Sequence, residues 1–361
     1  MRALIVGVDL GLPDYRAQRE EFNMLAKGAG ADIVGQMTAR RDRPDAAHFI
    51  GSGKVQEVVA QLEETQADIV LFDQPLSSAQ QRNLERKFHV RVVDRVALIL
   101  DIFALRAKSH EGKLQVELAQ LQHLSTRLTR LWSHLERQRG GIGMRGPGES
   151  QLEMDRRMIG DKVKMLKERL SKVQRQRTTQ RRARSRGASL SISLVGYTNA
   201  GKSTLFNALT RADAYAADQL FATLDTTTRR VWIEEAGQVT VSDTVGFIRD
   251  LPHTLIAAFR ATLEEAINAD LLLHVIDASS EQRDEQIQQV QHVLTDIGAG
   301  EVPQIFIYNK IDNLGLPARI ERDSHGTIHK VFISANERNG LGLVRQAVAE
   351  FALYAGTHAI H

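Results

Sequence analysis

Glycine, lysine and serine stand at the spacing of a phosphate-binding loop in the segment G-Y-T-N-A-G-K-S-T at residues 196–204. In the pattern G-x-x-x-x-G-K-[ST], the glycines let consecutive backbone N–H groups turn toward phosphate oxygens. Lys202 can reach the β- and γ-phosphates, and the Ser203 hydroxyl can ligate Mg²⁺. We therefore assign phosphate binding to Gly196, Tyr197, Thr198, Asn199, Ala200, Gly201, Lys202, Ser203 and Thr204.

The elements around this loop are those that phosphate binding requires. Residues 191–195 (S-I-S-L-V) have the composition of a buried strand, and residues 203–210 open an amphipathic helix. The N-terminus of a helix favours anions because its backbone N–H groups and its dipole point at the ligand. The alternative, a glycine turn without a ligand, is disfavoured by this order of strand, loop and helix.

A second motif, N-K-I-D at residues 309–312, predicts that the base is guanine. It follows the apolar run 304–308, at the expected carboxyl end of a parallel strand. An aspartate there can accept hydrogen bonds from guanine N1–H and N2–H₂. Another base would leave this buried carboxylate unpaired, so the site should favour guanine over that base by about 10⁴-fold. Alone the motif is weak, and a polar loop after a strand would be the favoured interpretation. The P-loop before it and S-A-N after the strand 331–333 make GTP the predicted nucleotide.

Within the base site each residue has an expected role. Asn309 would support the loop and the N7 side of the base, and Lys310 would lay its aliphatic stem along the purine face. The backbone N–H of Ala335 can donate to guanine O6. The predicted set is Asn309, Lys310, Ile311, Asp312, Ser334, Ala335 and Asn336.

Two further segments are candidate switches. In D-T-V-G, after the strand 239–242, Asp243 can hold Mg²⁺ through a water and the Gly246 N–H can bond the γ-phosphate. That bond exists only with GTP, so the loop should order with GTP and release after hydrolysis. In F-A-T-L-D we favour Thr223 as a Mg²⁺ ligand, with Thr226, Thr227 and Thr228 as open alternatives. The predicted switch residues are Phe221, Ala222, Thr223, Leu224, Asp225, Asp243, Thr244, Val245 and Gly246.

Phe247 follows D-T-V-G where Ras-like enzymes carry a glutamine that orients water. A phenyl ring cannot do this, so intrinsic turnover should be slow, in the range where a stimulating partner contributes about 10³- to 10⁵-fold. Asn199 is a candidate ligand of a monovalent cation, K⁺, that replaces an arginine finger; the alternative is a polar residue that caps a turn. The predicted catalytic residues are Lys202, Thr223, Gly246 and Asn199.

Composition limits the class of protein. The 361 residues are 42% hydrophobic and include no cysteine, which excludes disulfides and thiolate metal sites. No apolar run approaches the roughly 18 residues needed to span a bilayer, and residues 1–9 lack the layout of a signal peptide. We expect a cytoplasmic monomer without a membrane span.

The net charge of +3 conceals an uneven distribution along the chain. Residues 110–187 hold 19 Lys plus Arg against 8 Asp plus Glu, whereas the remainder holds 28 against 36. A basic middle between acidic flanks predicts contact with nucleic acid.

We expect an α/β protein of three parts joined by a linker. Residues 1–108 alternate strands (3–8, 32–37, 69–72, 90–93) with helices (16–29, 54–65, 77–88), which predicts a small parallel α/β domain. G-S-G-K at 51–54 resembles half a P-loop, but a helix-initiating turn is favoured because His48 replaces the first glycine and Val55 follows the lysine. A basic linker at 176–188 leads to a GTPase domain at 189–361 with a mainly parallel sheet.

Leucines at steps of three and four predict an antiparallel helical hairpin over residues 109–175. A break at R-G-G-I-G-M-R-G-P-G (139–148), which a helix does not tolerate, would form its tip. Bare backbone and arginines there can approach RNA phosphates and unpaired bases, whereas the alternative is a flexible connector. The first seam is Leu114, Leu118, Leu121, Leu124, Leu128, Leu131 and Leu135; the second is Leu152, Ile159, Val163, Leu166, Leu170 and Val173. The candidate RNA-binding residues are Arg137, Arg139, Gly140, Gly141, Arg145, Gly146, Gly148, Arg156 and Arg157.

These motifs together resemble the HflX family of ribosome-associated GTPases, among the Obg-HflX-like P-loop GTPases. The segments that carry the resemblance are F-I-G-S-G-K-V (49–55), R-G-G-I-G-M-R-G-P-G-E-S-Q-L-E (139–153), the P-loop, F-A-T-L-D-T-T-T-R and D-T-V-G-F-I. The tip segment is specific to this family, and the nucleotide motifs are shared with many GTPases. The resemblance prefers Thr223 as the switch threonine, and the family characteristically lacks the glutamine.

The resemblance also implies binding to the large ribosomal subunit and its rRNA, with the hairpin tip near the peptidyl-transferase region. It implies splitting of stalled or idle ribosomes and GTP hydrolysis stimulated by the ribosome. Larger members carry a further domain after the GTPase, whereas this sequence ends one helix after Asn336. The rival hypotheses are a GTPase that assists ribosome assembly or RNA modification, and a signalling switch whose hairpin binds protein.

Overall fold

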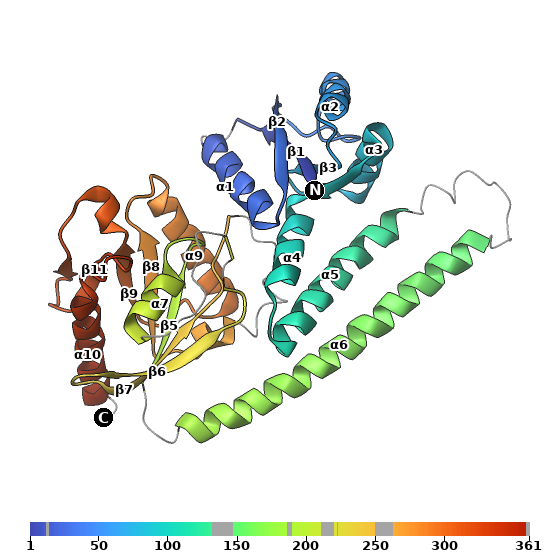
Figure 1. The fold of residues 1–361 in the computed structure, drawn as a ribbon. Helices are drawn as coiled ribbons and strands as arrows, with labels where there is room; N and C mark the ends of the chain where they lie inside the picture. The colour runs from blue at the N-terminus through green and yellow to red at the C-terminus, as the bar shows by residue number, and fades with distance from the viewer. Residues whose placement is uncertain are drawn as a thin grey trace. The chain divides into compact units, whose positions relative to one another are not determined.

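The computed structural model describes residues 1–11, 14–131, 147–185, 190–210, 220–221, 223–249 and 263–358. It divides into two compact units, Met1–Leu105 with Lys113–Leu170 and Arg106–Gly112 with Ser171–His361. Residues 106–112 belong to the second unit, and the four parts expected from the sequence (1–108, 109–175, 176–188 and 189–361) stay a prediction. Figure 1 shows the elements of both units in chain order.

The first unit contains the predicted parallel α/β fold. Its sheet has the order β2-β1-β3-β4 and every pairing is parallel. Its core includes Leu4, Val70 and Phe72, which are fully buried. The strands are β1 (Arg2–Asp9), β2 (Asp32–Arg40), β3 (Ile69–Phe72) and β4 (Arg91–Asp94), and the helices between them are α1 (Tyr15–Gly28), α2 (Ser52–Thr65) and α3 (Ser78–Phe88).

Helix α4 (Arg95–Arg106) follows β4 directly and was not among the expected elements. Its sequence, R-V-A-L-I-L-D-I-F-A-L-R, is a nearly continuous apolar run, from which periodicity alone cannot distinguish a strand from a buried helix. Val96, Ile99 and Phe103 are buried, so this helix packs through most of its surface.

The hairpin is formed by α5 (His110–Leu131) and α6 (Pro147–Ser185). Leu114 and Leu118 pack against Leu166 and Leu170, and Lys162 pairs with Glu117 at 2.8 Å. Leu124 is 45% exposed, contrary to the expected seam, because two helices alone cover only part of each leucine farther along the pair. The side chains of Leu128, Leu131, Leu135 and Leu152 lie outside the described residues.

Helix α6 extends past both ends that the sequence suggested. It begins at Pro147, so Gly148 lies in its first turn, where the fixed φ of proline suits a helix start. It continues through Ser185, across most of the segment expected to be a linker, because arginine and glutamine are good helix formers even without an apolar period. Its 39 residues correspond to about 58 Å at 1.5 Å per residue.

The second unit is built on a seven-stranded sheet of order β10-β11-β9-β8-β5-β7-β6. Only β10–β11 and β6–β7 pair antiparallel among the described strands, so the sheet is mainly parallel, as predicted. The strands are β5 (Leu190–Gly196), β6 (Thr227–Ile233), β7 (Gly237–Asp243), β8 (Leu271–Asp277), β9 (Gln304–Asn309), β10 (Arg319–Arg322) and β11 (Ile328–Phe332); the helices are α7 (Lys202–Thr210), α9 (Arg283–Ile297) and α10 (Leu341–His358), with a 3₁₀ turn η2 (Ile311–Leu314).

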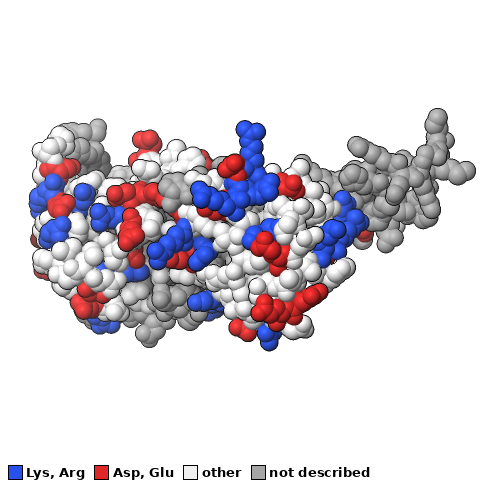
Figure 2. All heavy atoms as spheres, turned by 90° about the horizontal axis from the view of Figure 1, so that it is seen from above, with Lys and Arg blue, Asp and Glu red and all other residues white. Residues whose placement is uncertain are grey.

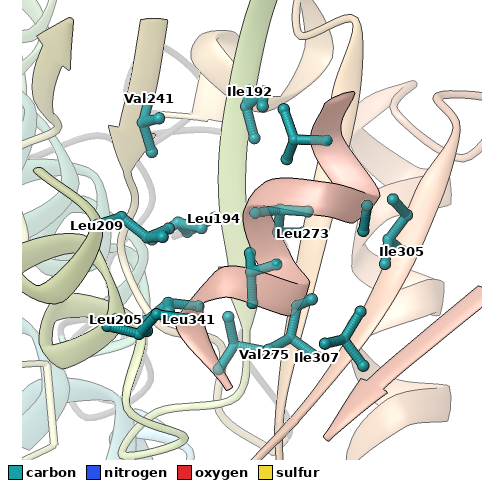
Figure 3. Packing of buried hydrophobic residues seen from close by; sticks show 14 of the residues in the cluster. Ile192, Leu194, Leu205, Leu209, Val241, Leu273, Val275, Ile305, Ile307 and Leu341 are labelled. Atoms are coloured by element: carbon teal, nitrogen blue, oxygen red, sulfur yellow. The ribbon is translucent and has the colours of Figure 1, made fainter. Parts of the chain in front are cut away.

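Apolar side chains from both helices and strands fill the core of this unit. Figure 3 shows Leu205 and Leu209 of α7 and Leu341 of α10 beside the strand residues Leu194 and Val275. This packing fixes the carboxyl ends of β5, β7, β9 and β11, where the predicted nucleotide motifs begin.

On the face drawn in Figure 2, basic and acidic side chains of the described residues are interspersed. Among the described helices, none combines the length and apolar character that crossing a bilayer requires.

Candidate nucleotide site

The loop between β5 and α7 has the backbone conformation that the glycine spacing predicted. Gly196 has φ of 149° and Gly201 has φ of 93°, values that favour glycine. A Cβ on Gly196 would overlap the carbonyl of Val275, and one on Gly201 would overlap Nδ2 of Asn309. Asn199 also has positive φ (61°), which asparagine tolerates in a turn. The loop is therefore shaped by close backbone packing on two sides.

Lys202 is buried within this loop. Its Nζ donates to the carbonyl oxygens of Gly196 at 3.1 Å and Tyr197 at 2.9 Å. Burial lowers the pKa of the ammonium to about 8, and the nearby Asp243 carboxylate opposes that shift. A phosphate at this position would favour the charged form, because an opposite charge stabilises a buried ammonium.

Three oxygen-bearing side chains converge beside the P-loop. The Ser203 hydroxyl donates to Oδ2 of Asp243 at 2.6 Å and lies 2.7 Å from the Thr223 hydroxyl, which donates to the same oxygen at 3.0 Å. Burial raises the pKa of Asp243, while the Ser203 hydrogen bond and Lys202 lower it. Its Oδ1 is buried and has no hydrogen-bond partner among the described residues. Hydroxyl and carboxylate oxygens are the ligands that Mg²⁺ prefers, so the residues present fit this ion.

The rival switch threonines are placed differently. Thr227 and Thr228 belong to β6, and the Thr228 hydroxyl lies 3.0 Å from the hydroxyl of Ser242 in the β6–β7 ladder. Thr223 is the threonine whose hydrogen bonds reach both Ser203 and Asp243. Thr223 stays the predicted Mg²⁺ ligand on these contacts, and Thr226 is not in β6.

The segment after β7 is held against the P-loop by its backbone. Phe247 N–H donates to the Gly196 carbonyl at 3.1 Å, and Thr198 N–H donates to the Phe247 carbonyl at 2.7 Å. A Cβ on Gly246 would lie 2.8 Å from the Thr198 methyl group and 3.0 Å from Lys202 Nζ, so this position requires glycine. The Phe247 side chain is 1% exposed and packs in the interior.

Asn309 connects the base motif to the P-loop and to the S-A-N loop. Its Nδ2 donates to the Ala200 carbonyl at 2.9 Å, as expected of a supporting residue, and its Oδ1 accepts from Ala335 N–H at 2.9 Å. The Ala335 N–H therefore bonds Asn309 in the structure, and its bond to guanine O6 stays a prediction. Buried amides seek such partners, which is why neighbouring loops share this side chain.

The remaining base residues lie on the turn after β9. Lys310 Nζ pairs with Oδ2 of Asp277 at 2.7 Å, and Asp277 ends the neighbouring strand β8. Within the part of the chain that the structure describes, Oδ1 of Asp312 is buried without a hydrogen-bond partner, which suits an acceptor for the edge of guanine. Ser334 is fully buried, and its hydroxyl accepts from Glu337 N–H at 3.1 Å.

Sequence reasoning missed several residues that organise the site. Asp277 orients Lys310, and its signal was the carboxylate that ends L-L-L-H-V-I-D. The Tyr197 hydroxyl accepts from Arg249 N–H at 2.7 Å, and Arg249 pairs with Glu285 at 3.0 Å. No motif in the sequence indicates these contacts.

The Asp225 carboxylate accepts from the backbone N–H groups of residues 108 and 109. Its contribution to GTP binding stays a prediction. Ala222 and the candidates Arg137, Arg139, Gly140, Gly141, Arg145 and Gly146 lie outside the described residues. Arg156 and Arg157 are exposed on α6.

A P-loop, a hydroxyl and carboxylate cluster and an Asn-Lys-x-Asp turn on a mainly parallel sheet define a P-loop protein that binds guanine nucleotides. Three family models match the chain in order. They are GTP-binding GTPase N-terminal at residues 16–104, GTP-binding GTPase Middle Region at 106–184 and 50S ribosome-binding GTPase at 191–310.

Curated relatives place the chain in one family. GTPase HflX of Escherichia coli (strain K12) is 52% identical over 332 residues, covering 92% of this chain and 78% of the relative. GTPase HflX of Caldanaerobacter subterraneus subsp. tengcongensis is 46% identical over 360 residues, covering 99% of this chain and 82% of the relative. The chain belongs to the HflX family of GTPases, enzymes that hydrolyse GTP.

Solved structures agree with the fold. The crystal structure of SsGBP with GDP has a TM-score of 0.54 at 24% identity and covers 98% of this chain and 99% of its own. A GTP-binding protein of Sulfolobus solfataricus, also with GDP, has a TM-score of 0.51 at 23% identity and covers 98% of this chain and all of its own.

Proposed function

We propose that this GTPase binds the large ribosomal subunit and uses its nucleotide cycle to dissociate stalled or idle ribosomes. The observation that carries the proposal is the combination of a complete nucleotide site with a basic helical hairpin in one chain. Support comes from the match to the 50S ribosome-binding GTPase model over residues 191–310. Rearrangement of loops between GTP and GDP states is the physical basis for such a cycle.

Magnesium belongs to this proposal. The hydroxyls of Ser203 and Thr223 would ligate Mg²⁺, and Asp243 would hold it through a water. Bound Mg²⁺ supplies charge neutralisation at the β- and γ-phosphate oxygens. The protein prepares this position, because all three side chains already converge there.

Hydrolysis then depends on groups of the chain that hold the γ-phosphate. Lys202 places its ammonium against the β- and γ-oxygens, and Gly246 brings a backbone N–H to the γ-phosphate. Phe247 is committed to the interior, so the attacking water must be oriented by another group. We infer slow turnover alone and stimulation by the ribosome. Asn199 is the candidate K⁺ ligand, and equal GTPase rates in potassium and sodium buffers would remove that role.

The hairpin supplies recognition. Arginines can pair with phosphates or stack on unpaired bases, and glycine backbone permits close approach. We propose that Arg137, Arg139, Arg145 and the glycines of 140–148 contact rRNA, with Arg156 and Arg157 nearby on α6. Because phosphate contacts release counterions, binding should weaken steeply with salt. Weak salt dependence would favour a protein partner instead.

The proposal is tested by adding purified large subunits and whole ribosomes to the enzyme. Large subunits should raise the GTPase rate by about 10³-fold or more, in the range of stimulating partners. Light scattering of whole ribosomes should fall when a GTP analogue is present and stay constant with GDP. Co-sedimentation independent of the nucleotide would contradict the coupling. Binding only to immature particles would indicate assembly.

A further inference from the structure

The carboxylate of Asp225, just after the switch threonine, bonds the segment that starts helix α5. Its Oδ2 accepts from the backbone N–H groups of Lys108 and Ser109, each at 2.7 Å, and its Oδ1 accepts from the Ser109 hydroxyl at 2.5 Å. All these residues belong to the GTPase unit. Hydrogen bonds to an ionised acceptor are roughly twice as strong as neutral ones, so this contact holds the two segments firmly.

The same contact continues into the first turn of α5. The Ser109 hydroxyl accepts from Gly112 N–H at 2.8 Å, which is the bond of a helix N-cap. A Cβ on Gly112 would overlap Oδ1 of Asp225 and lie 3.0 Å from Ser109 Oγ. Glycine at this position therefore leaves room for the carboxylate, even though glycine weakens a helix.

Residues 223–225 are fixed at both ends. Thr223 bonds Ser203 and Asp243, which are the proposed Mg²⁺ residues, and Asp225 bonds the start of α5. Leu224 between them is 2% exposed. An extended residue spans at most about 3.6 Å, so a displacement of Thr223 is carried almost directly to Asp225.

We infer that Asp225 is a positioning residue that couples the switch threonine to the N-cap of α5. While Asp225 is hydrogen-bonded to Ser109, Thr223 is held at the position where it would contact GTP and Mg²⁺. When the switch releases after hydrolysis, the Ser109 cap of the hairpin's first helix loses the carboxylate that orients it. Coupling between two sites is reciprocal, so a partner that distorts the start of α5 must alter affinity for GTP. The inference rests on the proposed role of Thr223 and is independent of what the hairpin binds.

Three substitutions break the link in different ways. Asp225→Ala removes the acceptor, and Ser109→Ala removes the hydroxyl that joins it to the helix. Gly112→Ala places a methyl group where the carboxylate lies, yet alanine is a better helix former than glycine. A defect in this last variant therefore cannot be ascribed to a weaker helix.

Two matched controls exist in the chain. Asp323 also accepts two backbone N–H groups, from His325 at 2.9 Å and Thr327 at 3.0 Å, so Asp323→Ala removes a carboxylate with a similar set of bonds in the turn between β10 and β11. Gly53 lies in the first turn of α2, and a Cβ there meets nothing within 4 Å. Gly53→Ala therefore matches Gly112→Ala without the clash.

The test measures nucleotide affinity and hydrogen exchange on the full chain. The three link variants should lose about tenfold in affinity for a non-hydrolysable GTP analogue with Mg²⁺, within the usual range of coupling, and less than about twofold for GDP. In the wild type, the amides of Lys108, Ser109 and Gly112 should exchange about tenfold more slowly with the analogue than with GDP. The link variants should lose this difference, and both controls should keep it.

Equal losses of affinity for the GTP analogue and GDP would overturn the inference, because they would mean that Asp225 only supports the fold. Exchange at Lys108, Ser109 and Gly112 that ignores the nucleotide in the wild type would also overturn it. Thr223→Ala should abolish the exchange difference; if it does not, the threonine is not the origin of the signal. Ribosomes are absent from these assays, so failure of ribosome stimulation would refute the proposed function and leave this link intact.

Discussion

The loops at residues 196–202 and 51–54 both place glycines before a lysine at the start of a helix, yet their surroundings differ. In the first loop, Lys202 is 6% exposed and bonds two carbonyls of its own loop. In the second, Lys54 Nζ pairs with Glu57 of the same helix, and no glycine has positive φ. Lys202 is therefore buried within its loop, whereas Lys54 lies on the surface of its helix.

Glycines before a lysine are therefore not enough to form a phosphate-binding loop; the packing around the backbone also matters. The P-loop glycines are required because Val275 and Asn309 approach the backbone closely. The N-terminal loop borders a hollow of about 460 Å³ lined by Arg40, Arg41 and Asp45, and Gly51 serves as the N-cap of α2 with extended backbone. The predicted helix-initiating turn at 51–54 is confirmed.

Removal of each lysine should give the largest contrast. Lys202→Ala removes the charge that faces the β- and γ-phosphates, and we expect kcat/KM for GTP to fall by about 10³-fold or more. Lys54→Ala should leave kcat/KM within about twofold, since its partner is Glu57 on an exposed helix face. Steady-state kinetics on both variants decide this, and a comparable loss in both would show that the two loops act together.

Base recognition gives the next contrast. Asp312→Asn replaces an acceptor with a donor at one edge, so the affinity for GTP should fall by about 10²- to 10⁴-fold. Xanthosine triphosphate, which carries an oxygen where guanine carries N2–H₂, should bind the variant better than GTP does. Binding titrations of GTP and xanthosine triphosphate with the wild type and the variant measure this change of preference. A parallel loss for both would point to collapse of the turn, which circular dichroism would reveal.

The lowered pKa of Lys202 should make the nucleotide affinity of the P-loop depend on pH. In the free protein this pKa is lowered to about 8 by burial, whereas bound phosphate favours the ammonium. Nucleotide binding should therefore take up protons above about pH 8, and affinity should fall by up to about tenfold per pH unit there. Calorimetry in buffers of different ionisation enthalpy measures the uptake. Constant affinity from pH 7 to 9.5 would contradict the buried charge.

The same lowered pKa should make the free energy of unfolding of the free protein change with pH in the opposite direction to the nucleotide affinity. A lysine whose folded pKa lies below its unfolded value penalises the fold while both states are protonated. The free energy of unfolding should therefore rise between about pH 8 and the unfolded value of 10.5, as the penalty is relieved. Denaturant unfolding with and without GDP separates the two effects.

The nucleotide site could be predicted because each motif does its chemistry within a few residues. Gly201, Lys202 and Ser203 act through the local backbone and a single helix start, and the structure assembles them with Asp243 and Asn309 as expected. The fold class followed from alternating strands and helices in the first unit. Helix α4 could not be predicted because its apolar run has no period.

Contacts between distant segments were beyond prediction. Asp225 and Ser109 are 116 residues apart, and neither belongs to a pattern that names the other. The Ala335 N–H donates to Asn309, 26 residues earlier, and no motif pairs these two groups with each other. The extent of α6 depends on intrinsic helix propensity, which gives no boundary where apolar periodicity ends.

The smallest contrast lies in the two glycine positions and tests the geometric explanation directly. Gly201→Ala imposes φ of 93° on alanine and a clash with the Asn309 amide, so the free energy of unfolding should fall by about 1–3 kcal/mol. Gly53→Ala places a methyl group in open space on a helix, so stability should rise by about 0.5–1 kcal/mol. Urea unfolding of both variants measures the opposite signs. Equal and small changes in the free energy of unfolding would mean that the P-loop backbone adapts to a side chain. In that case the close approach of Asn309 would not explain why the loop at 196–202 has the conformation of a phosphate-binding loop while the loop at 51–54 only starts a helix.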